Sequence, residues 1–258
     1  MDDPLVFWSV LMTVAFVPSL LYLVWIRNTE KHSREPYRML LKVFAYGAIL
    51  SVLVAVVLEI ILLSLFDQNI ERVYEFLGEN PSIPVLVLVC VIAPFVEEAT
   101  KALGIFRAKR KRMMTELENG IVYGAAAGLG FAATENLLYE STAYLTDGVQ
   151  AFVATAVMRS LSSALLHATS SSLVGLGIAR SALQGKSWIP YYLGAVAMHS
   201  GFNFAASFGT MYYDSFGDSA YLIGLLAAFS IVIIGISVMR GKIRQLDRRH
   251  GWRRTRRT

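Results

Sequence analysis

Three ionisable side chains interrupt the apolar stretch "VIAPFVEEATKALGIF", which spans residues 91–106. The stretch has the composition of a membrane helix, where an ionisable group near the bilayer centre costs about 3 kcal/mol or more without a partner. Lys101 follows Glu97 at the favourable i,i+4 spacing and can neutralise one carboxylate. The second carboxylate of the Glu97–Glu98 pair then stays beside a like charge in low dielectric, which favours proton transfer.

Three further polar residues are predicted to share the depth of these glutamates. His167 and His199 fall in later apolar runs, and Asn203 lies one turn after His199 on the same helical face. With a helical rise of about 1.5 Å per residue, these groups and the glutamates lie roughly 12 to 20 Å from one predicted membrane edge. Two carboxylates, two imidazoles and a carboxamide can therefore meet near the middle of the membrane.

This combination of side chains suits hydrolysis of an amide bond. A glutamate beside a histidine can deprotonate a water molecule, and a second histidine with an asparagine can stabilise the resulting oxyanion. Two histidines and a glutamate could also bind zinc, but the sequence has no HExxH motif. We expect a metal-independent enzyme without a cofactor, with these predicted catalytic residues: Glu97, Glu98, His167, His199 and Asn203.

Structural roles stay open for several of these groups. A histidine in a membrane helix is often only a hydrogen-bonding partner between helices, and Glu97 with Lys101 could form only a stabilising pair. Glu135 and Arg159 are predicted to lie at similar depths, nearer the outer leaflet. They could be a purely structural ion pair or could support the site.

The elements that position these residues are predicted to be membrane helices. Of the 258 residues, 55% are hydrophobic and 17% are charged, which is unusual for a soluble domain. Each crossing needs roughly 20 apolar residues, and seven runs qualify: 5–26, 39–66, 83–106, 119–139, 149–180, 188–210 and 219–239. We predict an all-α, polytopic protein of the cell membrane that forms a single domain over residues 1–258.

The distribution of Lys and Arg predicts the orientation of these helices. Twenty of the 24 lie in alternate connections or in the C-terminal tail, residues 240–258, whereas the other connections are mostly acidic. By the positive-inside rule, the N-terminus is outside and the C-terminus is cytoplasmic. The same distribution argues against a nucleic-acid partner despite the formal charge of +5. We expect the tail to contact anionic lipid headgroups of the bilayer.

Two features of the apolar runs concern helix packing. Pro94, one turn before Glu97, removes a main-chain donor and is expected to kink its helix. Small residues let another helix approach closely, and we favour such packing over substrate docking for six of them in the run 119–139. They are Gly124, Ala125, Ala127, Gly128, Gly130 and Ala132.

Four segments resemble, in order, the motif blocks of the PrsW-type glutamic intramembrane proteases. They are "PFVEEATKALGIF", "ENGIVYGAAAGLGFAATENLLY", "RSLSSALLHATSSSLVGLGIA" and "MHSGFNFAAS", and they cover a core of about residues 91–207. The first looks like the family's EExxK motif, and Glu135 with Asn136 looks like its EN pair. This family is grouped with the CAAX prenyl endopeptidases and the bacteriocin-processing enzymes in one superfamily.

The resemblance implies cleavage of a membrane-anchored protein within the bilayer. In the best-known members of the family the substrate is an anti-sigma factor. Carried over to this sequence, the resemblance makes Glu97 the water-activating base and His167 its partner. His199 and Asn203 would form the oxyanion hole.

Further roles and two departures follow from the same resemblance. Glu98 would be the second acid of the motif, and Lys101 would balance its charge. Asn119 and Asn203 stand where the family often has an acidic residue. Asn203 still suits an oxyanion hole because an amide can donate a hydrogen bond. The remaining motif residues would support the site: Glu135, Asn136 and Arg159.

Two other classes of protein could carry buried carboxylates. A proton- or ion-coupled transporter would use them to carry the ion, and it would move protons across a vesicle membrane. A non-catalytic scaffold would use the polar layer only to pair helices, so that loss of a histidine would lower stability alone.

Overall fold

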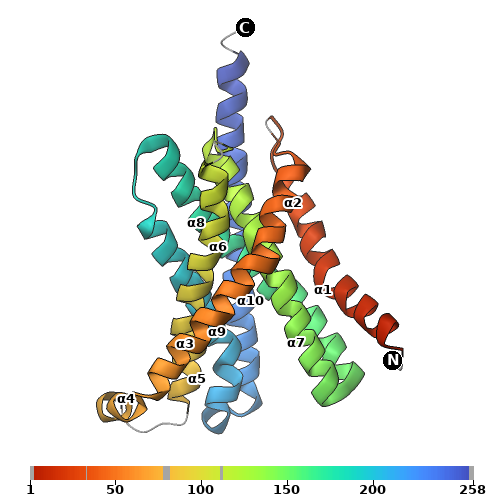
Figure 1. Cartoon of the computed structure of the whole chain (residues 1–258), viewed down its shortest axis with the longest axis vertical. Coiled ribbons are helices and arrows are strands. Elements are labelled where there is room, and N and C mark those ends of the chain that lie inside the picture. Colours follow the sequence, from red (N-terminus) through yellow and green to blue (C-terminus); the bar gives the residue numbers. More distant parts are fainter. Residues whose placement is uncertain (1–2, 33, 78–81, 111–112, 256–258) are drawn as a thin grey trace.

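The structure is a computed structural model that describes residues 3–32, 34–77, 82–110 and 113–255. Throughout these ranges every regular element is a helix, and the helices form one bundle (Figure 1). The all-α prediction is confirmed. In chain order the elements are α1 (Pro4–Arg27), α2 (Tyr37–Tyr46), η1 (Gly47–Ser51), α3 (Val52–Asp67), α4 (Ile70–Leu77), α5 (Ile83–Val87), η2 (Leu88–Ile92), α6 (Ala93–Arg110), α7 (Leu117–Leu161), α8 (Ser163–Gln184), α9 (Ile189–Phe216) and α10 (Asp218–Thr255).

Five helical runs of the described chain are long and apolar enough to cross a membrane. They make this a multi-pass membrane protein. One of them, Leu117–Gln184, contains two of the predicted spans, 119–139 and 149–180. The predicted span 188–210 lies mostly within α9, which is not among the five. The five runs are Leu5–Arg27, Tyr37–Asp67, Ile83–Lys109, Leu117–Gln184 and Asp218–Arg248.

The chain reverses its direction inside α7, at Gly148. This residue has φ 82° and ψ −164°, a conformation that favours glycine because a Cβ would clash there. The rings of Tyr144 and Phe152 meet across the turn with centroids 6.4 Å apart. As a result, the second half of α7 runs back along the first and brings Arg159 to Asn136.

Two of the long helical rods contain a π-helical turn. η1 joins α2 to α3, and η2 joins α5 to α6 directly before Pro94. In η2 the N–H of Ala93 bonds to the carbonyl of Leu88, five residues earlier. By the same pattern the Val89 carbonyl would accept from residue 94, but proline has no N–H. A kink was expected at Pro94. The structure instead has a π-helical turn directly before it, in which Pro94 supplies no N–H to the Val89 carbonyl.

The first half of α7 forms the centre of the bundle, and its small residues are buried. A Cβ built on Gly124 would lie 2.2 Å from the carbonyl oxygen of Ser171 in α8, and one on Gly128 would lie 2.0 Å from that of His167. The backbones of α7 and α8 are thus in direct contact, as small residues allow. The packing interpretation of these residues is confirmed.

A polar cluster around Glu35 fixes the connection between α1 and α2. Glu35 accepts hydrogen bonds from the Asn119 amide and the Tyr123 hydroxyl at the start of α7. Asp247 of α10 accepts from the backbone N–H of Lys31 at 2.9 Å. An amide at residue 119 suits this place because it can donate to Glu35, which a carboxylate could not do.

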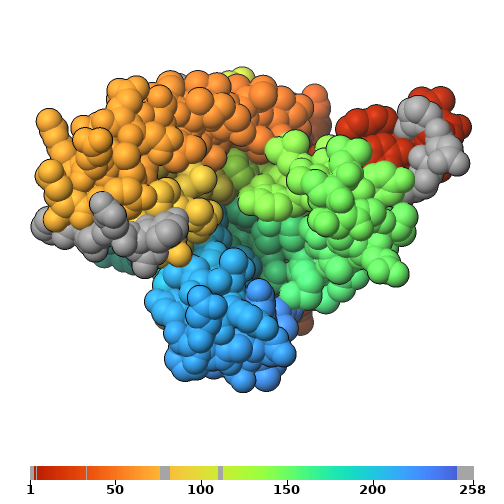
Figure 2. Space-filling model, turned by 90° about the horizontal axis from the view of Figure 1, so that it is seen from below, coloured from red at the N-terminus to blue at the C-terminus, as the bar shows by residue number. Residues whose placement is uncertain are grey.

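The two ends of the bundle differ in shape. The C-terminus extends as part of α10 beyond the other helices (Figure 1). At the opposite end, α3 with α4, the turn of α7, and α9 with the start of α10 form three lobes around a recessed centre (Figure 2). The prediction that the tail contacts lipid headgroups concerns side chains that lie mostly outside the described ones, which end at residue 248.

Candidate active site

Lys101 is the centre of a polar cluster inside the bundle. α6 places Glu97 and Glu98 four and three residues before it, so both carboxylates can reach the ammonium. Its Nζ lies 3.0 Å from Oε2 of Glu97, 3.0 Å from Oε1 of Glu98 and 2.7 Å from Nδ1 of His167. The ring of Phe131 covers it, with Nζ 4.3 Å from the centroid. An ammonium group has three donors, and each has an acceptor here.

Glu98 is the more completely bound of the two adjacent carboxylates. Its Oε1 accepts from the Ser170 hydroxyl at 2.9 Å and lies 3.1 Å from Nδ1 of His199. Its Oε2 accepts from the Ser171 hydroxyl at 3.1 Å. Apart from the shared ammonium, the contacts of the Glu97 carboxylate with described residues are longer, to two imidazoles at 3.7 and 4.0 Å. Glu97 therefore keeps the accepting capacity that a base needs, whereas Glu98 holds α6 against α8 and α9.

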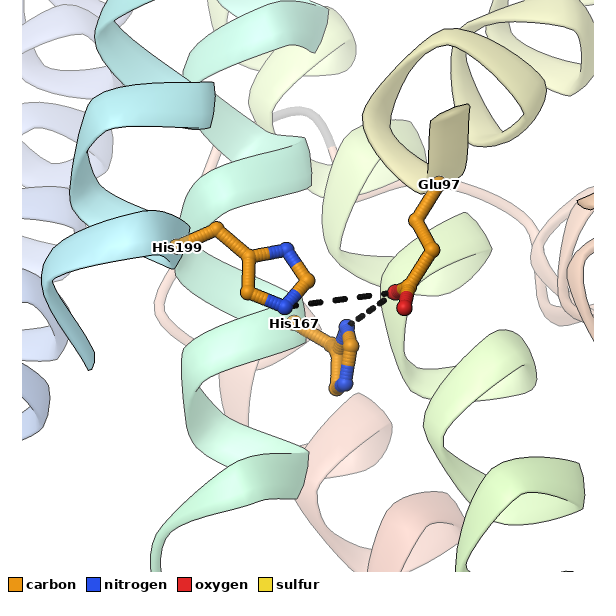
Figure 3. A group of neighbouring side chains, drawn as sticks. All are labelled: Glu97, His167 and His199. Carbon is orange, nitrogen blue, oxygen red and sulfur yellow. Dashed lines mark ion pairs between the residues drawn. The ribbon is translucent and has the colours of Figure 1, made fainter. Parts of the chain in front are cut away.

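The two imidazoles face Glu97 from different helices, His167 from α8 and His199 from α9 (Figure 3). Their opposite ring nitrogens are held by other carboxylates. Nε2 of His167 lies 2.8 Å from Oε2 of Glu135, and Nδ1 of His199 lies 3.1 Å from Glu98. Because an ionised carboxylate can only accept, those nitrogens carry the hydrogen. In neutral rings the nitrogens that face Glu97 then present lone pairs.

Arg159 fixes Glu135 from the returning half of α7. Its Nη2 lies 2.9 Å from Oε2 of Glu135, and its Nε donates to Oδ1 of Asn136 at 2.9 Å. The guanidinium also lies over the ring of Tyr139, 3.8 Å from the centroid. The ion pair expected from matched depth is present, and through Glu135 it reaches His167. Glu135 therefore contacts both Arg159 and His167.

The side-chain amide of Asn203 contacts the backbone of η2 rather than a member of this cluster. It donates to the carbonyl of Val89 at 2.7 Å, the carbonyl that Pro94 leaves without a main-chain donor. Asn203 shares a helical face with His199, but this contact turns its side chain towards η2. The oxyanion role expected for Asn203 therefore has no geometric support here, and its contact is structural.

The cluster is nearly closed to solvent. Glu97 is 6% exposed, and the other cluster members on α6, α8 and α9 are exposed by 2% or less. The side chains of Glu135 and Arg159 are 21% and 19% exposed and form the most open edge. The hydrolysis expected from the sequence needs water at Glu97, whereas the described side chains leave this cluster almost closed to solvent.

Comparison with known proteins identifies the family. The sequence profile described as PrsW family intramembrane metalloprotease matches residues 35–235, most of the chain. The chain belongs to the PrsW family. It is also similar to Protease PrsW of Clostridioides difficile (strain 630), with 34% identity over 132 residues, which is 50% of each chain. The matched part thus spans about half the length of that relative. No solved structure matches.

Membership in the PrsW family confirms the resemblance drawn from the four motif blocks. The profile reaches further than those blocks, because it begins at residue 35 and so includes α2, η1 and α3. The membership favours the protease hypothesis over the transporter and the scaffold. No comparison assigns a catalytic role to any single residue.

The PrsW family description includes a metal, and the donor atoms of Glu97, His167 and His199 fit one. These atoms lie within 4.8 Å of one another, and two imidazoles with a carboxylate are a donor set of catalytic zinc. Each imidazole is also backed by a carboxylate, as is usual around zinc. However, the Lys101 ammonium contacts two of the three donors, so an ion would require it to withdraw. The expected metal independence has no support from this donor set.

Three members of this cluster were not predicted from the sequence: Ser170, Ser171 and Phe131. Ser170 and Ser171 follow His167 at i+3 and i+4, a spacing that places them on its helical face and could have found them. Hydroxyls in membrane helices usually bond to their own helix, so they were not expected to bind Glu98. Phe131, which covers the ammonium, carries no signal that distinguishes it from other core aromatics.

Proposed function

We propose that this chain is an intramembrane endopeptidase that hydrolyses a peptide bond of a membrane-anchored protein. The observation that carries the proposal is the convergence of Glu97, His167 and His199, from three helices, inside a membrane-embedded bundle (Figure 3). Membership in the PrsW family supports a hydrolytic use of this cluster over a purely structural one.

Glu97 is the proposed general base. It takes a proton from a water molecule, and the hydroxide attacks the carbonyl carbon of the scissile bond. The proton then passes from Glu97 to the amide nitrogen, the C–N bond breaks, and the carbonyl re-forms as a carboxylic acid. Of the two adjacent glutamates, Glu97 suits this role better because the acceptor sites of Glu98 are occupied.

His199 and Lys101 are the proposed partners of the oxyanion. Both face the space beside Glu97 where negative charge would develop, with Nε2 of His199 4.0 Å and Nζ of Lys101 3.0 Å from Oε2. The Lys101 ammonium is a donor already in place and can stabilise such charge without reorganisation. Nε2 of His199 can donate only when its ring carries a hydrogen on both nitrogens, as an imidazolium. His167 is the proposed partner of the base, and Glu135 holds its ring in one orientation.

Water and substrate need an opening in this arrangement. The groups around Glu97 are buried, whereas Glu135 and Arg159 are about one-fifth exposed. We assign the access route to their edge of the cluster. Substrate binding would then separate helices there and admit one water molecule beside Glu97.

The same residues can serve a metal-dependent form of the reaction. A bound divalent ion would be held by Glu97, His167 and His199, and it would supply Lewis-acid activation of water and of the scissile carbonyl. In that form Glu135 would still orient the imidazole of His167, and Glu98 that of His199. Lys101 would leave the space between the donors and pair with Glu98 alone.

The orientation and the substrate are also part of the proposal. The alternation of basic and acidic connections supports seven crossings with the N-terminus outside and the C-terminus cytoplasmic. A membrane-anchored substrate, such as an anti-sigma factor, follows from the family resemblance.

The test replaces the proposed base. Membranes from cells that express the wild type or Glu97→Gln are compared by mass spectrometry of protein N-termini, which detects any new cleavage product. Glu71→Gln is the matched control, because Glu71 is exposed on α4 and undergoes the same change. New N-termini in the wild type and in the control, absent from Glu97→Gln, are expected. Equal cleavage by Glu97→Gln would exclude Glu97 as the base.

A second measurement separates the two forms of the mechanism. The purified enzyme is treated with a strong chelator, and cleavage of a substrate found above is followed with and without added zinc. A metal-independent enzyme keeps its rate. If the chelator abolishes cleavage and added zinc restores it, Glu97, His167 and His199 would be assigned as metal ligands.

A further inference from the structure

A cavity of about 830 Å³ lies between α8, α9 and α10, away from the carboxylate cluster. The three helices pack against one another, and the cavity is lined by their side chains and by Ile121 of α7. None of the residues proposed for catalysis lines it. Its walls are mainly apolar, formed in large part by Leu173, Leu176, Met198, Ile231, Ile234 and Val238.

One end of this apolar chamber is basic. Lys242 and Gln245 line that end, and a second cavity of about 310 Å³ shares Leu176 and Lys242 with the first. The second cavity adds Arg180 and Tyr191 to the lining. The two cavities therefore adjoin, with two cations where an apolar chamber meets a more polar one.

The hydrogen-bond partners of both cations among the described residues are neutral. Nζ of Lys242 donates to Oε1 of Gln245 at 2.9 Å. Arg180 donates to the Tyr191 hydroxyl and to Oε1 of Gln184. This differs from the buried Lys101, which contacts two carboxylates. An anion placed between Lys242 and Arg180 would supply the negative charge that their neutral hydrogen-bond partners lack.

We propose that the two cavities form a binding site for one anionic phospholipid. One acyl chain lies in the apolar chamber, and the phosphate lies between Lys242 and Arg180. The volume is in the range of ligand sites, roughly 300–1,000 Å³. Basic pockets between membrane helices often bind anionic lipid headgroups. Most basic residues after Arg240 lie at this end of α10.

A peptide helix fits the chamber less well than an acyl chain. With a diameter of 10–12 Å and a pitch of about 5.4 Å, one helical turn occupies roughly 400–600 Å³. The larger cavity would hold no more than two turns, whereas a membrane span needs about five. An acyl chain is thinner and can follow the cavity along α10 from Ile231 to Lys242.

The chamber shares two helices with the catalytic cluster. Met198 lines it and directly precedes His199, and Thr169 lines it two residues after His167. A lipid that fills the chamber would therefore fix the spacing of α8 and α9 behind the two imidazoles. We expect bound lipid to raise the thermal stability of the whole chain.

The test uses the purified full chain in a neutral detergent. Phosphatidylglycerol and phosphatidylcholine with identical acyl chains are added, and binding is measured by native mass spectrometry and by the shift in Tm. The wild type is expected to bind phosphatidylglycerol at least tenfold more tightly. Equal binding of the two lipids would overturn the proposed headgroup site.

Matched variants locate the site. Lys242→Gln should weaken phosphatidylglycerol binding about tenfold, whereas Lys42→Gln, the same change at an exposed residue of α2, should not. Equal losses of phosphatidylglycerol binding in the two variants would mean that the lipid responds to surface charge in general. That result would overturn the proposal. Gly201→Leu should fill the chamber, because a Cβ there meets nothing closer than 3.9 Å.

A second measurement does not depend on the variants folding. Phosphatidylglycerol with a photoreactive acyl chain is bound to the wild type, and the labelled peptides are identified. Labels on α8, α9 and α10 near Thr169, Met198 and Ile234 are expected. Labels elsewhere, or displacement of the lipid by a single-span peptide from these positions, would contradict a lipid site.

Discussion

Nζ of Lys101 lies 2.7 Å from Nδ1 of His167, so a buried ammonium donates directly to a buried imidazole. An ammonium cannot accept a hydrogen bond, and Nδ1 must therefore present its lone pair. The hydrogen of the ring is then on Nε2, where Glu135 accepts it at 2.8 Å. One lysine thus sets the tautomer of His167 and occupies the lone pair that a proton or a metal would need.

Loss of the Lys101 ammonium should lower the free energy of unfolding of the protein. Lys101→Met leaves Glu97 and Glu98 buried without their shared cation, and breaking a buried charge pair in this way costs about 3–5 kcal/mol. Thermal unfolding in detergent, followed by intrinsic fluorescence, measures the loss. The double variant Lys101→Met with Glu98→Gln should recover part of it, because one unpaired carboxylate is removed. A double variant no more stable than Lys101→Met would argue against this pairing.

A variant of Asn203 can distinguish an oxyanion-hole role, which the sequence led us to expect, from the structural hydrogen bond to Val89. Asn203→Ala removes the donor to the Val89 carbonyl and should lower stability by about 1–2 kcal/mol, with little change in turnover per folded molecule. An oxyanion-hole residue would behave in the opposite way, with kcat reduced about 10²–10³-fold at an unchanged Tm. Measuring Tm and kcat on the same preparation decides between the two.

Gly128 should not tolerate a methyl group. A Cβ at this position would lie 2.0 Å from the carbonyl oxygen of His167, so Gly128→Ala forces α7 and α8 apart. We expect a stability loss of about 1–3 kcal/mol and lower activity, because His167 moves with its backbone. Gly241→Ala is the control, since a Cβ there meets no atom within 4 Å. Equal effects of the two changes would contradict this account of the helix contact.

Glu30 should make stability depend on pH. Burial, followed by the charges of Glu35, Glu118 and Asp247, raises the pKa of Glu30 from its ordinary value to about 8, although a hydrogen bond from the Glu35 backbone opposes this. Between about pH 4.5 and 8 the folded chain then holds a proton that the unfolded chain has released. Stability should therefore fall as pH rises through this range, by at most about 1.4 kcal/mol per pH unit.

Thermal unfolding from pH 5 to pH 9 measures this dependence. In Glu30→Gln the fall in Tm should be smaller, because residue 30 no longer titrates. Glu71→Gln, at an exposed position of α4, should follow the wild type. A Glu30→Gln variant with the same pH profile as the wild type would remove Glu30 as the source.

Only part of the contacts within the candidate site follows from the sequence, for physical reasons. Glu97 and Glu98 could be placed with His167 and His199 because helical rise fixes depth in a membrane. Depth does not fix which way a side chain turns. The π-helical turn before Pro94 leaves the carbonyl of Val89 free, and Asn203 turns towards it.

The sequence by itself determined that the chain is an all-helical, multi-pass membrane protein, and it singled out the few ionisable groups within the apolar runs. Bilayer thickness sets the length of each apolar run, and the cost of burying charge singles out the few ionisable groups within them. Only the tertiary structure decided how those groups pair. Lys101 joins Glu97, Glu98 and His167 because α6 and α8 face each other, and that packing depends on contacts between residues far apart in the chain. The same long-range packing closed the cluster to water and formed the chamber beside α10.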